Sequence, residues 1–315
     1  MLRKIVCAAL LFACSAHAQY PAKPIRVVVP FPAGSSTDII TRVLASSVSQ
    51  ALGQTLVVDN KAGADGAIAA AEVAKAAPDG YTLLMATNSP MSAVPALKKA
   101  PPYDPVADFT PITDIGRYTF FILVHPSVPA KTLKELIDYA RAHPGKLNYA
   151  TGNTTGIVST AYFASLARIE LVHVPYKGEP QAVTDLVAGR VQLMFCSSGT
   201  SIAHIRDGRL RALVTTLAKR SQLLPEVPTI AEAGMPQFSI TSWAGLFGPA
   251  RMPREVVERL NKEFVAAMAR SDVQAAMEKA AFALNPSTPG ELAAFVQEQM
   301  ESYRRILRAA GVEPE

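Results

Sequence analysis

Val27-Val28-Val29-Pro30-Phe31-Pro32-Ala33-Gly34-Ser35-Ser36-Thr37-Asp38 joins a β-branched run to a helical pattern through a turn that contains two prolines. Pro30 and Pro32 end the predicted strand, because proline has no N–H group to donate to a sheet ladder. Gly34 permits a tight turn, and the four residues after it are of the types that cap helices. A strand that feeds a helix in this way presents free backbone N–H groups and the positive end of the helix dipole. The stretch therefore predicts an anion site.

Strand and helix patterns alternate outward from this stretch through most of the chain. The predicted strands are Arg26–Val29, Thr55–Asp59, Thr82–Ala86, Phe120–His125, Leu147–Ala150, Leu171–Val174, Gln192–Phe195 and Arg211–Thr215. Helical patterns lie between them, and such alternation is typical of an α/β fold with a mostly parallel sheet covered by helices. The carboxyl end contains no predicted strand, and Arg254–Arg270 and Glu291–Ala310 are expected to be long amphipathic helices.

The amino terminus has the pattern of a signal peptide over residues 1–18. Basic residues at 3–4 precede the apolar run Ile5–Ala13, and Ala16–Ala18 is a small-x-small cleavage site. The run is too short to span a bilayer core of about 30 Å, so we expect export with cleavage near Ala18. A lipobox-like pattern ending at Cys14 is the alternative, which would leave a lipid anchor there; Phe12 fits that pattern poorly.

The composition indicates that the mature chain is held together by its hydrophobic core and not by disulfide bonds. Cleavage leaves Cys196 as the sole cysteine, which excludes an internal disulfide. The 31 Lys and Arg residues against 26 Asp and Glu residues are spread along the chain, which argues against nucleic-acid binding. Proline-rich boundaries predict two lobes. Residues 19–121 plus 246–315 are expected to form the first lobe, and residues 122–245 the second.

Three further loops follow predicted strands and resemble the first one. They are Asn60–Gly66, Thr87–Pro90 and Ala150–Gly156, and each supplies small side chains, backbone N–H groups or hydroxyls. Because ligands of open α/β sheets bind beyond the carboxyl ends of the strands, we expect these loops to converge. Ordinary turn and cap chemistry is the alternative for any single loop. Asp38 and Asp65 would repel an anion, so we interpret both as caps or loop braces.

Catalytic motifs find little support in the sequence. Residues 34–38 do not form the G-x-S-x-G nucleophile elbow, and the chain contains neither a P-loop nor G-x-G-x-x-G. The histidines lack zinc-ligand spacing, and Cys196 ends an apolar run, where a small core residue is the simpler interpretation. We therefore expect no catalytic residues, no metal and no cofactor.

Ordered motifs along nearly the whole mature chain carry a family resemblance. They are Tyr20–Arg26, Pro30–Gly34 with Asp38, Asn60–Ala64, Ala77–Leu83, Val174–Gly178, Gly208–Leu213 and Pro225–Gly234. With these motifs the chain resembles the periplasmic solute-binding proteins of the tripartite tricarboxylate transporter system, the Bug receptor family. The resemblance implies a monomeric, two-lobed Venus-flytrap protein of the periplasm. Such a protein would close on a small organic acid, a mono- or dicarboxylate and in some cases an aromatic acid, and deliver it to membrane permease subunits.

The resemblance also implies a set of ligand-binding residues. Those of the first lobe are Phe31, Ala33, Gly34, Ser35, Gly63, Ala64 and Thr87, with Asp38 bracing the loop. Those of the second lobe are Thr151, Gly152, Asn153, Thr154, Thr155 and Cys196. Cys196 stands where family members often carry aspartate, which makes an amino-acid ligand less expected.

Two other interpretations stay open at this stage. Arg117 is interpreted as a solvated surface arginine, and the alternative is that its guanidinium fork pairs with a second ligand carboxylate. The protein as a whole has alternatives too: a ligand-presenting partner of a membrane sensor, or an exported hydrolase on the same fold with a threonine or Cys196 as nucleophile.

Overall fold

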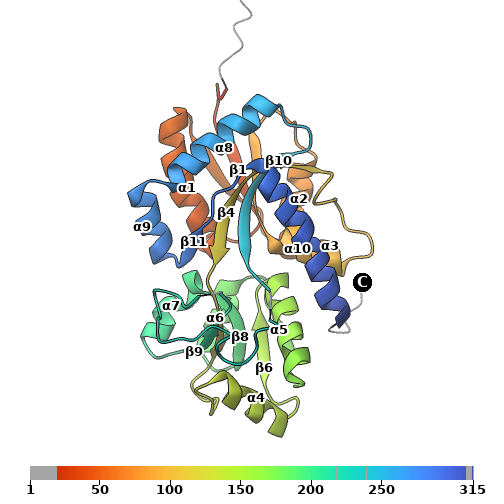
Figure 1. Ribbon diagram of the computed structural model, residues 1–315, viewed down its shortest axis with the longest axis vertical. Coiled ribbons are helices and arrows are strands. Elements are labelled where there is room, and N and C mark those ends of the chain that lie inside the picture. Colours follow the sequence, from red (N-terminus) through yellow and green to blue (C-terminus); the bar gives the residue numbers. More distant parts are fainter. Residues whose placement is uncertain (1–19, 218, 239, 310–313, 315) are drawn as a thin grey trace, which may run out of the picture.

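The computed structural model describes residues 20–217, 219–238, 240–309 and 314. It consists of two α/β lobes, one above the other in Figure 1, each built on its own β-sheet. The two-lobed α/β fold predicted from the sequence is therefore confirmed. The expected signal peptide and Cys14 lie outside the described residues.

The first lobe contains a six-stranded sheet in the order β11-β4-β10-β3-β1-β2. Its strands are β1 (Ile25–Val29), β2 (Leu56–Asn60), β3 (Thr82–Thr87), β4 (Phe109–Tyr118), β10 (Trp243–Pro249) and β11 (Phe282–Leu284). Strand β1 runs parallel to β2 and β3. The other three pairings of this sheet, β10 with β3, β10 with β4 and β11 with β4, are antiparallel.

The second lobe contains a five-stranded sheet in the order β7-β6-β8-β5-β9. Its strands are β5 (Phe120–Val124), β6 (Asn148–Thr151), β7 (Val172–Pro175), β8 (Leu193–Ser197) and β9 (Arg211–Thr215). Strand β6 is parallel to β7 and β8, whereas β5 is antiparallel to both of its neighbours.

The sheets are thus mixed, and the expectation of mostly parallel sheets is wrong. The antiparallel members β5 and β10 are the strands that enter a sheet directly from the other lobe, so no crossover helix turns them into the parallel direction. The expectation of a strand-free carboxyl end is also wrong. Strand β11 is only three residues long and pairs with Gly116–Tyr118, and so short a strand has no recognisable periodicity.

Helices cover both faces of the first sheet. They are α1 (Ser36–Leu52), α2 (Ala67–Ala74), α3 (Val94–Leu97), α8 (Arg254–Met268), α9 (Ser271–Lys279) and α10 (Pro289–Ala309), with a 3₁₀ turn at Ala64–Gly66 and a π turn at Ser89–Ala93. Side chains of a strand alternate between faces. Val27 and Val29 accordingly pack in the cluster formed with α1 and α8, and Val28 packs in the cluster formed with α2 and α10.

The second sheet is covered in the same manner by α4 (Leu133–Ala142), α5 (Thr154–Ala167), α6 (Glu179–Val187) and α7 (Ser198–Arg206). Ile122 and Val124 of β5 pack in the cluster that contains α4 and α5. Phe121 and Leu123 pack in the cluster that contains α6. None of the helices in the described part of the chain combines the length and apolar character of a membrane span.

The chain crosses between the lobes at two places that lie side by side. Strand β4 ends at Tyr118 and β5 begins at Phe120, and the chain returns before β10 begins at Trp243. The Tyr118 N–H donates to the Ser242 carbonyl over 3.0 Å, which joins the two crossings. Helix α10 descends from the first lobe and also contacts α5 of the second (Figure 1). These connections set the positions of the loops that face each other between the lobes.

Candidate ligand-binding cleft

A cavity of about 30 Å³ lies between the lobes, with room for about two water molecules. The first lobe and the crossings line it with Phe31, Pro32, Ser35, Ser36, Thr37, Thr87, Asn88, Ser89, Tyr118 and Ser242. The second lobe contributes Phe120, Gly152, Asn153, Thr155, Glu179 and Ser197. Eleven of these sixteen described residues carry a hydroxyl or amide side chain, and none of the sixteen is Lys, Arg or His.

The amino terminus of α1 forms one wall of the cavity. Ser35 is the N-cap, with extended backbone angles, and its Oγ accepts from the Asp38 N–H over 3.3 Å. The first N–H groups of a helix have no partner within the helix, so those of Ser36 and Thr37 add to the positive end of the α1 dipole. This wall can stabilise negative charge without a basic side chain.

Asp38 fastens the loop that leads into α1. Its Oδ2 accepts from the Gly34 N–H over 3.0 Å, and its Oδ1 accepts from Asn60 Nδ2 over 3.0 Å. Burial alone would raise the pKa of Asp38, but hydrogen bonds from Arg42, Gly34 and Asn60 hold that pKa below its usual value. The charge of Asp38 is therefore neutralised locally by Arg42, at 2.9 Å. Gly34 itself has a φ of 80°, which favours glycine at this turn.

A hydrogen bond between serines joins the two lobes on one side of the cavity. Ser36 Oγ of α1 lies 2.6 Å from Ser197 Oγ at the end of β8. Close packing accompanies this contact, because a Cβ added at Gly199 would lie 2.4 Å from Ser36 Oγ. Only glycine at position 199 leaves the space that the Ser36 side chain now occupies.

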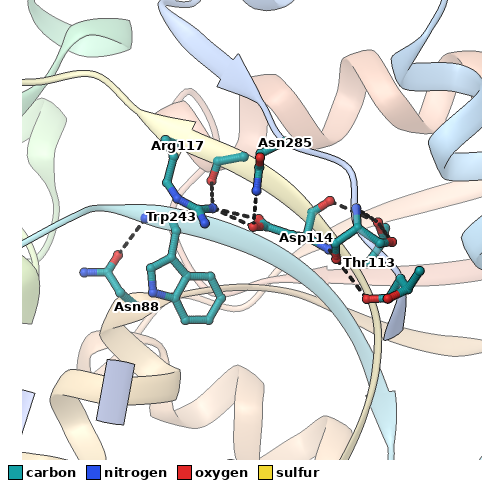
Figure 2. Close-up of polar contacts among 9 residues, drawn as sticks. Asn88, Thr113, Asp114, Arg117, Trp243 and Asn285 are labelled. Carbon is teal, nitrogen blue, oxygen red and sulfur yellow. Dashed lines mark hydrogen bonds and ion pairs between the residues drawn. The ribbon is translucent and has the colours of Figure 1, made fainter. Parts of the chain in front are cut away.

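Asn88 joins the lobes on the other side. Its Nδ2 donates to Thr155 Oγ1 of α5 over 2.6 Å, and the neighbouring Ser89 Oγ lies 2.9 Å from the same hydroxyl. Its Oδ1 accepts from the Trp243 N–H over 3.3 Å (Figure 2) and from Ser242 Oγ over 3.2 Å. Asn88 therefore connects the first lobe, the second crossing and the second lobe.

Glu179, the first residue of α6, is the one acidic side chain among the described residues that line the cavity, and it is only 8% exposed. Its Oε1 accepts from Asn153 Nδ2 over 3.1 Å, and its Oε2 accepts from Thr200 Oγ1 over 3.1 Å and from Ser197 Oγ. Burial raises the pKa of Glu179, and these hydrogen bonds oppose the effect.

A groove of about 610 Å³ adjoins the cavity. Phe31, Pro32 and Gly152 line both spaces, and the groove continues between residues 62–66 of the first lobe and residues 176–181 of the second. Lys177 is its basic residue and Asp65 its acidic one. The groove extends the site toward the side of the loop after β2.

The structure brings together part of the residue set expected from the sequence. Phe31, Ser35, Thr87, Gly152, Asn153 and Thr155 line the cavity, and Gly63 and Ala64 line the adjoining groove. Ala33, Gly34, Thr151, Thr154 and Cys196 line neither space. The Thr151 hydroxyl lies 2.7 Å from His173 Nε2, and Cys196 is fully buried with its Sγ 3.3 Å from Thr200 Oγ1.

Sequence reasoning missed several lining residues, notably Tyr118, Glu179, Ser197 and Ser242. Tyr118 and Ser242 belong to the crossings, Ser197 is the last residue of β8, and Glu179 follows the end of β7. The strand-end rule that located the other loops would have pointed to Ser197 and Glu179 as well.

Arg117 is held by the protein's own carboxylate. Its Nη1 donates to both oxygens of Asp114, at 2.9 and 2.7 Å, and Asn285 Nδ2 donates to the same carboxylate over 2.8 Å (Figure 2). The guanidinium also lies over the Phe295 ring, 4.3 Å from its centroid. Arg117 therefore anchors β4 beside β11 and α10, and it is not among the residues that line the cavity.

The described residues contain no group of three or more His, Cys, Asp or Glu side chains arranged to hold a metal ion. Burial raises the pKa of the Cys196 thiol well above its usual value, which keeps the sulfur protonated and poorly nucleophilic.

Comparison with known proteins agrees with this architecture. A protein from Pseudomonas sp. strain P51, encoded between tcbD and tcbE, is 39% identical over 91% of this chain and 86% of its own. The periplasmic binding protein BugD is 33% identical, with a TM-score of 0.88 over 94% of this chain and all of BugD.

Two solved structures from Rhodopseudomonas palustris carry ligands. One, with adipate, is 32% identical with a TM-score of 0.90 over 94% of this chain and all of that one. MatC, with bound malate, is 31% identical with a TM-score of 0.86 over 91% of this chain and all of MatC. The family model of the tripartite tricarboxylate transporter family receptor matches residues 40–312. The chain belongs to this receptor family.

Proposed function

We propose that this protein is a periplasmic receptor that captures a small organic carboxylate between its lobes and presents it to the membrane subunits of a tripartite tricarboxylate transporter. One observation carries the proposal: the amino terminus of α1 and a set of hydroxyl and amide groups surround a cavity that both lobes close. Such a site neutralises a carboxylate with N–H groups and a helix dipole. The ligand-bound relatives with adipate and malate support the same class of ligand.

The proposed binding mode uses both lobes. The carboxylate lies at the amino terminus of α1, where it accepts from the N–H groups and hydroxyls of Ser36 and Thr37. Asn153 and Thr155 of the second lobe then close on the ligand, and the hydrogen bonds from Ser36 and Asn88 across the cleft hold the closed form. Ligand binding favours closure by its higher affinity for the closed state.

The cellular setting is part of the proposal. A monomeric protein, exported by the signal peptide at residues 1–18, fits the family and its periplasmic members. The sensor alternative shares this binding chemistry, and co-purification with permease subunits would distinguish it from uptake. The hydrolase alternative would need an accessible nucleophile, and Cys196 is fully buried.

A thermal-shift and calorimetry panel tests the proposal. Malate, adipate, succinate and benzoate are compared with 1,6-diaminohexane, a cation that the site should reject. A ligand at about 100 times its Kd should stabilise the protein by about 2.7 kcal/mol. Failure of every acid to shift the melting temperature would contradict carboxylate binding.

A matched pair of variants tests the location of the site. Thr37 lines the cavity, whereas Thr41, one helical turn later, donates its hydroxyl to the Thr37 carbonyl over 2.6 Å. Thr37→Val should weaken ligand affinity about 5- to 30-fold, the equivalent of about 1–2 kcal/mol for one hydrogen bond. Thr41→Val should leave affinity unchanged. Equal effects of the two substitutions would refute the placement.

A further inference from the structure

Glu179 is the feature of the cavity that the binding of a carboxylate does not explain. It is a buried carboxyl group in a lining that otherwise consists of neutral side chains. A ligand carboxylate enclosed in this cavity would add a second negative charge close to the first. Two carboxylates that share a site cannot both stay ionised without a large energetic cost, so Glu179 must affect which ligands the cleft accepts.

A chain of hydrogen bonds connects Glu179 to the opposite lobe. Asn153 Oδ1 accepts from the Gly156 N–H over 2.9 Å as the N-cap of α5, which fixes the orientation of its amide. Asn153 Nδ2 therefore donates to Glu179 Oε1 in either protonation state. Glu179 Oε2 instead meets the hydroxyl of Ser197, and Ser197 Oγ lies 2.6 Å from Ser36 Oγ of the first lobe. Thr200 Oγ1 also lies 3.1 Å from Oε2 and 3.3 Å from the Ser197 carbonyl, so its hydroxyl can donate to either oxygen and needs no proton from Glu179.

The direction of this chain depends on one proton. When Glu179 is ionised, the Ser197 hydroxyl donates to Oε2 and accepts from the Ser36 hydroxyl. When Oε2 carries a proton, Glu179 donates to Ser197 and Ser197 donates to Ser36. The Ser36 hydroxyl is then free to donate into the cavity, at the amino terminus of α1.

We propose that Glu179 is a specificity-determining residue of the cleft and that a carboxylate is captured together with one proton, which is taken from solvent onto Glu179 Oε2. This inference rests on the proposed function. The proton removes the charge repulsion and, through Ser197, turns the Ser36 hydroxyl into a donor for the ligand. A ligand that presents an ammonium group to the second lobe would instead leave Glu179 ionised.

Of the ionisable groups near the cavity that are named below, Glu179 is the one that we expect to change its protonation state when a ligand binds. Tyr118 of β4 and Cys196 of β8 lie close enough to interact with it, and burial raises the pKa of both, so both stay neutral near neutral pH. Asp38 of α1 is neutralised by Arg42. The α6 helix begins at Glu179 and α7 begins at Ser198, so their dipoles favour the ionised form, while burial favours the neutral form.

The test measures protons taken up on binding. Malate and adipate are titrated calorimetrically into the purified mature protein between pH 5.5 and 8.5, in buffers that differ in ionisation enthalpy. We expect uptake to rise toward one proton per ligand at the higher pH values. Above the pKa of Glu179 in the free protein, the Kd should weaken by up to about tenfold per pH unit.

Glu179→Gln is the decisive variant. Its amide oxygen can accept from Asn153 and its NH₂ can donate to Ser197, so the chain keeps the direction in which Ser36 donates to the ligand. The variant should bind the acids with little pH dependence, more tightly than the wild type at pH 8.5, and without the extra proton. Protons that the ligand itself takes up or releases contribute equally to the calorimetric signals of the wild type and Glu179→Gln. Glu226→Gln, the same change at an exposed position, should behave as the wild type.

The outcomes separate this inference from the proposed function. Binding of either acid without proton uptake, or with equal uptake by the wild type and Glu179→Gln, overturns the role of Glu179 and leaves the receptor function intact. Binding of neither acid by any variant overturns carboxylate capture, and the inference fails with it.

Discussion

Gly199→Ala offers a way to weaken closure of the cleft without weakening either lobe. Gly199 belongs to the first turn of α7 in the second lobe, and Ser36 begins α1 in the first. A Cβ at position 199 would lie 2.4 Å from Ser36 Oγ and 3.2 Å from Ser36 Cβ. The obstruction therefore arises between the lobes and is relieved when they separate.

The size of the effect follows from two terms. Loss of the Ser36–Ser197 hydrogen bond costs about 1 kcal/mol, and an extra methyl group in a close-packed contact costs about 1–3 kcal/mol. If the Ser36 side chain rotates away, only the first term applies. Closure should thus be disfavoured by about 1–3 kcal/mol, which corresponds to a loss of ligand affinity of about 5- to 150-fold. Within α7 itself alanine is the better helix former, by up to about 1 kcal/mol.

Calorimetry and thermal unfolding together test this reasoning. We expect Gly199→Ala to bind malate or adipate more weakly while the ligand-free protein melts at the same temperature or slightly higher. Addition of Ser36→Ala removes the atom that lies nearest, so the two substitutions should be strongly non-additive. Unchanged affinity, or a lower melting temperature without ligand, would refute an obstruction confined to the cleft.

Three further substitutions separate closure, loop bracing and anchoring. Thr155→Val removes the second-lobe acceptor of Asn88 Nδ2 but leaves its other acceptor, the Tyr303 hydroxyl. It should weaken ligand affinity about 5- to 30-fold in calorimetry, and unchanged affinity would argue against this contact. Asp38→Asn should lower the free energy of unfolding by about 1–2 kcal/mol at pH 7. Folding lowers the pKa of Asp38. The stabilisation is therefore complete above about pH 4 and is lost as the pH falls through the pKa of Asp38 in the folded protein. The free energies of unfolding of the wild type and Asp38→Asn, measured with denaturant, should converge in acid. Arg117→Met leaves Asp114, whose side chain is 4% exposed, without its cation. It should destabilise the protein by about 3 kcal/mol but change the ligand Kd less than about twofold. A large loss of affinity with little loss of stability would instead assign Arg117 to the ligand.

The strands that form parallel pairs could be predicted from the sequence because their signals are local. Each is a short apolar run followed by a capping loop and a helix, as at Val27–Asp38. Strand β4 has no such signal. It contains Pro111 and Gly116. The proline is tolerated because β11 pairs only with residues 116–118, so no strand on that side of β4 needs a hydrogen bond from a backbone N–H group at position 111.

The cavity could be predicted only in part for a related reason. Ser35 and Asn153 are the N-caps of α1 and α5, and Thr155 lies in the first turn of α5, so all three belong to segments whose capping chemistry is visible in the sequence. An acidic residue at the start of a helix, such as Glu179, looks the same whether it faces solvent or a closed cleft. What distinguishes it is burial against Ser197 and the first lobe, and that depends on contacts between residues far apart in the chain.

The position of Trp243 gives the protein an optical signal of its own. It is the chain's single tryptophan, and it begins β10 directly after the second crossing, with its backbone N–H on Asn88 and its ring against Phe247 and Phe295. Indole emission responds to small changes in packing and polarity. Because this side chain lies beside the segment that must bend when the lobes move, its fluorescence should change on closure. Stopped-flow fluorescence of the unlabelled protein can therefore follow the rate of closure.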